Sequence, residues 1–167
     1  MSKFLLDANV FIQAKRFYYP FDLFPGFWDW LDREMENGIF LTVEPIYKEL
    51  TAGEDELSEW IEQRKSNGCI LPVDDETTQN HFKEIAFWTV NSTQQFKQTA
   101  YEEFLAVGDS WLVAKAYATG ATIVTQERLD NNCRKRILIP NACQNFGINY
   151  INTLELIRST GAKFGLR

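Results

Sequence analysis

The sequence predicts an α/β fold, a three-layer α/β/α sandwich around a central, mostly parallel sheet of five strands. Short apolar runs alternate along the chain with segments of helical periodicity, which is the pattern of strands joined by helices. The apolar runs are continuous rather than alternating, as in strands that are covered on both faces. The chain has 167 residues, enough for one domain with its own core, and neither a linker nor an internal repeat divides it. We therefore expect a single domain over residues 1–167.

Local sequence signals give the approximate bounds of the elements. Pro45 is suited to the first turn of a helix, Gly120 to the end of one, and Asn152-x-x-Glu155 resembles a capping box. The expected strands are residues 4–6, 39–43, 69–73, 121–125 and 148–151. The expected helices are residues 45–50, 54–65, 74–90, 94–105, 109–119 and 153–159.

Composition argues against a membrane or secreted protein. The chain is 45% apolar and 14% aromatic, and no window approaches the ~20 apolar residues of a membrane span. The amino-terminal apolar run is short and is interrupted by Asp7, unlike a signal peptide. We therefore expect a cytoplasmic protein that does not bind membranes.

Cysteine and histidine are too scarce for the common disulfide and zinc frameworks. The three cysteines, Cys69, Cys133 and Cys143, are odd in number and lack Cys-x-x-Cys spacing, so we expect unpaired core or surface residues. The single histidine, His81, is expected on the exposed face of a helix. The chemistry of the chain therefore depends on carboxylates.

The chain has a net charge of −6 and an isoelectric point near 4.9. It therefore lacks the overall basic character of proteins that hold nucleic acid by its phosphates. A site built of carboxylates contributes negative charge itself, and a bound divalent metal reverses the sign of the charge locally. The total charge therefore does not exclude a nucleic-acid substrate.

Residues 17–30 include eight aromatic side chains among fourteen residues, with Pro20 and Pro25 between them. The prolines predict a loop in the first half of the segment. We interpret the aromatic residues first as a satellite core that fixes this loop to the domain. Two alternatives stay open, namely a dimer or partner surface and a platform on which unpaired bases stack. The residues of such an RNA or partner surface would be Lys15, Arg16, Tyr18 and Tyr19.

Four acidic residues occupy corresponding places in this architecture. Asp7 follows the first strand, and Glu49 lies on the helix after the second. Asp109 opens a helix, and Glu127 follows the fourth strand. The carboxyl ends of parallel strands meet at one edge of a sheet, where ligands bind, so we expect the four acids to converge there.

Each acid has another explanation when it is taken alone. Asp109 could complement the dipole of its helix, Glu49 could be a solvated helix residue, and Glu127 could lie on a loop surface. Their shared position is what favours a site. Carboxylates without histidine are ligands suited to Mg²⁺ or Mn²⁺, and such a metal lowers the pKa of a water that attacks a phosphodiester. The set therefore predicts metal-dependent phosphodiester hydrolysis without a protein nucleophile.

Motifs along the whole chain resemble a known family. They are Asp7-Ala8-Asn9-Val10-Phe11-Ile12, Tyr18-Tyr19-Pro20-Phe21, Phe27-Trp28-Asp29-Trp30-Leu31, Asp109-Ser110-Trp111-Leu112-Val113-Ala114, Val124-Thr125-Gln126-Glu127 and Phe146-Gly147-Ile148. In these motifs the chain resembles the PIN-domain ribonucleases, which include the VapC toxins of toxin–antitoxin pairs. It is more closely similar to an uncharacterised PIN-like family.

The resemblance implies an endoribonuclease that depends on Mg²⁺ or Mn²⁺ and has RNA as its substrate. Asp7, Glu49 and Asp109 match the three acids that hold the metal in PIN domains. Asn9 and Ser110 match supporting polar positions. The resemblance also implies an antitoxin protein as partner, and related toxins imply a homodimer.

The fourth acid of the PIN pattern is usually an aspartate two residues after a threonine or serine. Here Glu127 follows Thr125 by two residues, and Asp130 is the alternative. The longer side chain of Glu127 motivates a second hypothesis, a catalytically inactive PIN-like module that binds RNA or a protein. DNA also stays open as a substrate, because nothing in the sequence reads a 2′-hydroxyl.

Overall fold

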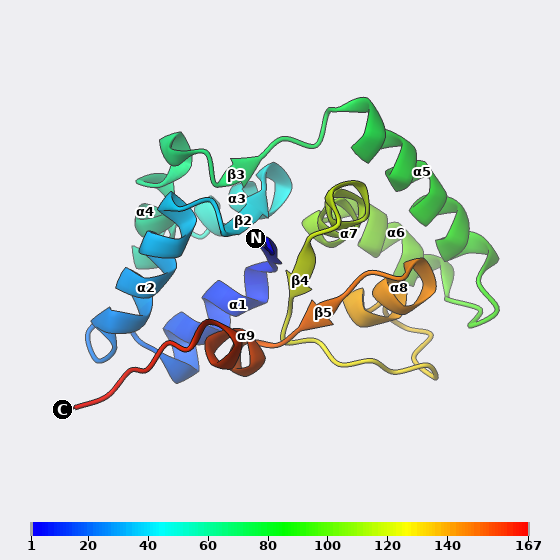
Figure 1. The fold of residues 1–167 in the computed structure, drawn as a ribbon. Coiled ribbons are helices and arrows are strands. Elements are labelled where there is room, and N and C mark those ends of the chain that lie inside the picture. Colours follow the sequence, from blue (N-terminus) through cyan, green and yellow to red (C-terminus); the bar gives the residue numbers. More distant parts are fainter. Residues whose placement is uncertain (1, 167) are drawn as a thin grey trace.

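The computed structural model describes residues 2–166 and contains the predicted five-stranded sheet (Figure 1). The strands follow the order β3-β2-β1-β4-β5, and every neighbouring pair is parallel. This confirms the α/β class, with a sheet that is entirely rather than mostly parallel. The strands are β1 (Phe4–Leu6), β2 (Phe40–Val43), β3 (Ile70–Leu71), β4 (Thr122–Val124) and β5 (Tyr150–Ile151).

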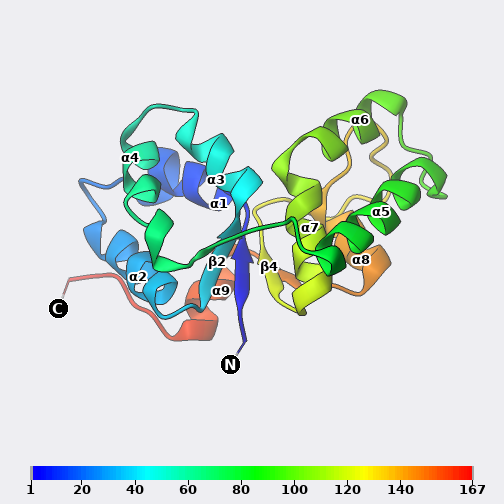
Figure 2. The ribbon, with the colours of Figure 1, turned by 90° about the horizontal axis from the view of Figure 1, so that it is seen from above.

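Helices cover both faces of the sheet and complete the three-layer sandwich (Figures 1 and 2). One face carries α1 (Ala8–Gln13), α2 (Pro25–Glu36), α4 (Glu56–Glu62) and α9 (Thr153–Thr160). The other face carries α5 (Glu76–Asn91), α6 (Gln98–Ala106), α7 (Gly108–Thr119) and α8 (Ile139–Phe146). Helix α3 (Glu44–Thr51) begins where β2 ends and contacts both α1 and α7. Two short segments, η1 (Ala14–Tyr18) and η2 (Lys65–Asn67), complete the elements.

The centre of the sheet explains why its strands are apolar throughout. The register places Leu5 of β1 between Leu41 of β2 and Ile123 of β4. These three side chains are buried because helices lie against both faces. Since all strands run in one direction, their carboxyl ends form a single edge, and the residues that follow β1, β2 and β4 meet there.

The predicted helices are present, with shifted ends. Helix α6 begins at Gln98 rather than at residue 94, because Gln95 has a φ of 58°, outside the helical region. Gly120 ends α7 in the left-handed conformation, as predicted. The Asn152 side chain caps α9 by accepting a hydrogen bond from the Glu155 N–H at 2.9 Å. Helices α1, α2 and α8 were not predicted.

The loop predicted for the first half of residues 17–30 is only partly correct. The segment η1 continues α1 as a π-helical turn, in which the Tyr19 N–H donates to the Ala14 carbonyl at 2.7 Å. The turn ends at Tyr19, since the residue before a proline, here Pro20, is disfavoured in the helical region. An irregular segment then runs to the start of α2.

Rings from both halves of the aromatic segment form the satellite core that was predicted. The Tyr19 ring stacks on Phe27 with centroids 4.3 Å apart, and Phe21 stacks on Trp28 at 4.0 Å. Phe27 and Trp28 are buried. Tyr18, by contrast, stays 56% exposed.

The scarce cysteine and histidine residues have structural rather than catalytic surroundings. Cys69 and Cys143 are buried, Cys133 is half-buried, and all three are free, as expected. The exposed position predicted for His81 is wrong, because its ring stacks on Tyr117 of α7 at 3.9 Å and its side chain is only 21% exposed. In the described part of the chain, no helix is long and apolar enough to cross a lipid bilayer.

Candidate active site

Asp7 lies at the end of β1, directly before α1, and only 3% of the residue is exposed. The Thr125 hydroxyl donates a 2.9 Å hydrogen bond to Asp7 Oδ2. Burial raises the pKa of the Asp7 carboxyl well above its usual range, and the charges of Asp109 and Glu127 raise it further. The hydrogen bond from Thr125 acts in the opposite direction. Asp7 is therefore a buried acid without enough positive compensation.

Asp109 lies in the first turn of α7, where its charge complements the helix dipole as the alternative explanation expects. It is not the N-cap residue of the helix, which is Val107. Burial raises the pKa of Asp109 from 3.8 to about 7, and the charges of Glu127 and Glu49 add to the effect. The nearby Arg136 lowers the pKa in part.

Glu127 follows β4 and turns back over the site. Its two carboxylate oxygens have different partners: Oε1 accepts a 3.1 Å hydrogen bond from the Ile139 N–H, and Oε2 pairs with Arg136 at 3.1 Å. Burial raises the pKa of Glu127, while both of these partners lower it. The side chain of Glu127 thus contacts one residue of the loop that follows it and the first residue of α8.

Glu49 is exposed on α3, but it is fixed to the start of α7. Its Oε1 atom accepts a 2.7 Å hydrogen bond from the Gly108 N–H, next to Asp109. A Cβ atom on residue 108 would lie 2.8 Å from Ile46 Cδ1 and 3.1 Å from Glu49 Oε1, so only glycine fits here without a shift. Gly108 was not predicted to belong to the site, although it precedes a motif that was singled out.

The three supporting polar residues position the loop after β4 or the start of α7. The Thr125 hydroxyl accepts from the Glu127 N–H at 3.1 Å while it donates to Asp7, so it joins two of the acids. Asn9 Oδ1 accepts from the Gln126 N–H at 3.2 Å. The buried Ser110 donates to the Val107 carbonyl at 3.1 Å within the first turn of α7.

Asp130, the alternative fourth acid, does not take part in this set. Its Oδ1 atom accepts a 2.9 Å hydrogen bond from the Asn132 N–H in its own exposed turn. It is not among the charges that raise the pKa of Asp7 or Asp109. Between the two candidates, the structure therefore places Glu127 beside the other acids.

Arg136 is a site residue that the sequence did not indicate. It belongs to the irregular segment between β4 and α8, is largely exposed, and neutralises part of the charge of Glu127. Its neighbours Arg134 and Lys135 are also basic, so composition alone does not distinguish the residue that pairs with the acid. Only the path of the loop brings Arg136 back to Glu127.

The acids supply oxygen ligands of the kind that a divalent metal binds. Within residues 2–166, no three acidic, histidine or cysteine side chains are grouped as a preformed metal centre. Their chemistry does fit one, because Asp7, Asp109 and Glu127 are oxygen donors whose mutual repulsion a cation would relieve. A metal bound by these residues would therefore require side-chain movements that bring the carboxylates together.

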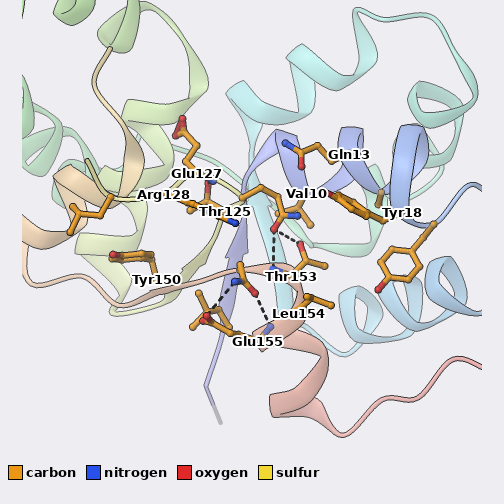
Figure 3. Close-up of a pocket in the computed structure, with 16 residues that line it drawn as sticks. Val10, Gln13, Tyr18, Thr125, Glu127, Arg128, Tyr150, Thr153, Leu154 and Glu155 are labelled. Carbon is orange, nitrogen blue, oxygen red and sulfur yellow. Dashed lines mark hydrogen bonds between the residues drawn. The ribbon is translucent and has the colours of Figure 1, made fainter. Parts of the chain in front are cut away.

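The predicted RNA or partner surface divides into two parts. Lys15 is engaged in an ion pair of 2.6 Å with Asp55, and the Tyr19 ring belongs to the satellite core. Arg16 and Tyr18 are exposed. Tyr18 also lines a pocket of about 440 Å³ that includes Thr125 and Glu127 in its wall (Figure 3). Of the two exposed residues, Tyr18 therefore shares a pocket with Glu127.

Solved structures share the fold of this chain. It is similar to VapBC2 from Rickettsia felis, a structure solved with a DNA fragment from its promoter, with a TM-score of 0.53 and 13% identity over 89% of this chain and 97% of the other. It is also similar to FitAcB from Neisseria gonorrhoeae, with a TM-score of 0.54 and 19% identity over 89% of this chain and 96% of the other. At these identities the likeness shows a PIN-like fold.

The sequence itself gives a narrower result. No curated protein matches it significantly. One family, described as a domain of unknown function (DUF4411), matches residues 4–164, which is nearly the whole chain and includes all four acids. The chain therefore belongs to this family, and its members are expected to share the PIN-like sandwich described above.

Proposed function

We propose that this protein is a metal-dependent endoribonuclease that hydrolyses RNA phosphodiester bonds. One observation supports the proposal above the others: Asp7, Asp109 and Glu127 come from distant parts of the chain and meet at the carboxyl edge of the sheet. There the charges of Asp109 and Glu127 raise the pKa of Asp7, and the charge of Glu127 raises the pKa of Asp109. A fold gains nothing in stability from such repulsion, since each uncompensated charge opposes folding. A site that accepts a cation explains why these acids lie together.

Mg²⁺ or Mn²⁺ bound here would supply the Lewis acidity that lowers the pKa of a water and balances charge on the leaving oxygen. Asp7, Asp109 and Glu49 would hold the metal, with Glu127 as the fourth acid. Thr125 keeps the Asp7 carboxylate oriented, and Gly108 fixes Glu49. Arg136 pairs with Glu127, and a bound cation would compete with it for that carboxylate.

Cleavage of RNA by the purified protein tests this proposal. We expect cleavage with added Mg²⁺ or Mn²⁺ and none with EDTA, and we expect Asp109→Asn to lose activity at least ~100-fold. Asp29→Asn, at an exposed position on α2, is the matched acid-to-amide control and should cleave like the wild type. Equal activity of Asp109→Asn and the wild type would refute the assignment. Single-stranded DNA of the same sequence should be cut more slowly if RNA is the substrate.

A second candidate is a PIN-like module that binds RNA or protein without cleaving. The absence of a preformed metal centre among residues 2–166, and the two protein partners of Glu127, favour it. Calorimetric titration with Mn²⁺ separates the two proposals. Binding that is lost in Asp109→Asn supports the enzyme, whereas no binding to the wild type supports the module.

The proposal extends to the partners. We propose that the protein is the toxin of a toxin–antitoxin pair and forms a homodimer, on the basis of the motifs that resemble VapC toxins and the PIN-like fold shared with VapBC2. An antitoxin that inserts an arginine between these acids would inhibit by neutralising them. Expression should then arrest growth, and Asp7→Asn should abolish the arrest. Sedimentation of the purified protein checks the dimer.

A further inference from the structure

A pocket of about 440 Å³ opens next to the acids, at the carboxyl ends of β4 and β5 (Figure 3). Its size is within the range of roughly 300–1,000 Å³ that is typical of small-molecule sites. Thr125 and Glu127 form part of its wall, so a group bound in the pocket would lie beside the candidate active site. Residues from the end of α1, from η1 and from the start of α9 form the remaining walls.

The polar groups that line the pocket fall into two sets. Some are already paired: Gln126 Oε1 accepts from both the N–H and the hydroxyl of Thr153, at 3.1 and 3.0 Å, and Asn152 Nδ2 donates to Glu155 Oε1 at 3.2 Å. These pairs give the pocket a fixed floor, which Figure 3 shows as dashed lines.

Other polar side chains in the pocket have no hydrogen-bond partner among residues 2–166. They include the Gln13 amide, the Arg128 guanidinium and the hydroxyls of Tyr18 and Tyr150. Gln13 and Tyr18 stand on one side of the pocket and Arg128 and Tyr150 on the other (Figure 3). Two aromatic rings, one planar cation and one amide are therefore available to a ligand.

Several large apolar side chains in the lining are exposed to solvent. Tyr18, Leu129 and Leu154 are 56%, 39% and 55% exposed, and all three line this pocket. A ligand that covers them must have an apolar face, and a ligand that satisfies Gln13 and Arg128 must have polar edges. The carboxylates of Glu127 and Glu155 line the same pocket and disfavour an anionic group inside it.

We infer that this pocket binds one unpaired base of a single-stranded nucleic acid, next to the phosphodiester that the acids would cleave. A nucleobase is planar and neutral, stacks on tyrosine rings and guanidinium planes, and carries donors and acceptors on its edge. The inference rests on the proposed nuclease function, because it assigns the substrate's base to the pocket and its backbone to the acids.

Binding of short oligonucleotides, measured by fluorescence anisotropy in EDTA, tests the pocket separately from cleavage. The ligands are a fluorescent single-stranded RNA, the same RNA with abasic sites, and the matched DNA. Tyr18→Ala and Arg128→Gln should each weaken RNA binding roughly 5- to 100-fold. The abasic RNA should bind the wild type weakly and be insensitive to Tyr18→Ala. If the two substitutions weaken RNA and DNA binding equally, the pocket recognises the base alone. If they weaken RNA binding more, the pocket also contacts the ribose.

Two control variants match the changes elsewhere on the surface. Phe87→Ala removes an exposed ring from α5, and Lys83→Gln removes an exposed charge from the same helix. Both should bind RNA like the wild type.

Unchanged RNA affinity in Tyr18→Ala and Arg128→Gln would overturn the inference, and so would equal affinity for abasic RNA. No oligonucleotide binding at all would also overturn it and leave a protein segment as the occupant. A failure of the proposed function looks different: metal-dependent cleavage would be absent while the effect of Tyr18→Ala on binding remained.

Discussion

Glu49 and Gly108 are joined by a 2.7 Å hydrogen bond from the Gly108 N–H to the Glu49 carboxylate. This bond connects α3, which follows β2, to the first residue of α7. The contact is close because residue 108 has no side chain, and the buried Ile46 fills the space where a Cβ atom would stand. The position of one acid of the site therefore depends on a glycine that carries no chemistry.

Replacing that glycine should disturb packing and the site together. In Gly108→Ala the new methyl group would lie 2.8 Å from Ile46 Cδ1, and Ile46 is fully buried, so the free energy of unfolding should fall by roughly 1–3 kcal/mol. Urea denaturation measures this. In the control, Gly26→Ala in α2, the added Cβ would lie 3.8 Å from Phe164, which is an ordinary van der Waals contact, so stability should not fall. Equal stability of the two variants would contradict the packing argument.

Asp109 should make the metal-free protein less stable as the pH rises. Its pKa is about 7 in the folded protein against 3.8 ordinarily, so between these values the folded state holds a proton that the unfolded state has lost. The free energy of unfolding should therefore decrease from pH 4 to pH 7, by on the order of 2–4 kcal/mol from this group at most.

Asp109→Asn removes this dependence, so the variant should be more stable than the wild type at pH 8 in EDTA, with the difference largely gone below pH 4. Thermal unfolding across the pH range measures both profiles. Asp29→Asn provides the control, since that acid is exposed on α2. Parallel profiles for the wild type and Asp109→Asn would show that Asp109 titrates normally.

Mn²⁺ should reverse the instability caused by the acids. A ligand that binds only the folded state stabilises it by about 2.7 kcal/mol at 100 times its dissociation constant. Protons compete for the same carboxylates, so the increase in melting temperature should be larger at pH 8 than at pH 5. Asp7→Asn should lose most of the increase, because it removes one of the negative charges. A similar increase in wild type and variant would place the metal elsewhere.

Loss of the Thr125 hydroxyl should affect Asp7 directly. In Thr125→Val, Asp7 loses its 2.9 Å donor and the Glu127 N–H loses its acceptor, with little change in shape. We expect the free energy of unfolding to fall by roughly 1–3 kcal/mol and the pKa of Asp7 to rise further. Carboxyl carbon NMR measures that pKa. Thr125→Ser keeps the hydroxyl and should retain the wild-type pKa. An unchanged pKa in Thr125→Val would mean that the bond does not form in solution.

The sequence predicted the elements whose signals are local. Gly120 ends α7 and Asn152 caps α9, and each signal lies within a few residues of the element it bounds. Helix α1 was not predicted because it begins immediately after Asp7, without a turn to separate it from β1. The π-helical turn at Ala14–Tyr18 extends α1 into a segment whose prolines indicate a loop.

The acids of the site could be predicted from the sequence, but the residues that pair with them could not. Asp7, Glu49 and Asp109 hold places fixed by the order of strands and helices, which sequence periodicity indicates. The ion pair of Arg136 with Glu127 depends on an irregular loop whose path no periodicity specifies. Likewise, Lys15 of η1 pairs with Asp55, the N-cap residue of α4, although 40 residues separate them in the sequence.

The bond between Thr125 and Asp7 spans 118 residues of sequence, because β1 pairs with β4 in the sheet. During synthesis, the ribosome releases Asp7 well before the loop after β4. A nascent chain that reaches only as far as α7 carries three of the four acids but lacks Thr125 and Glu127, so Asp7 cannot be oriented. If the protein cleaves RNA, the ribosome and message that produce it are exposed to an assembled site only after the residues beyond β4 have emerged.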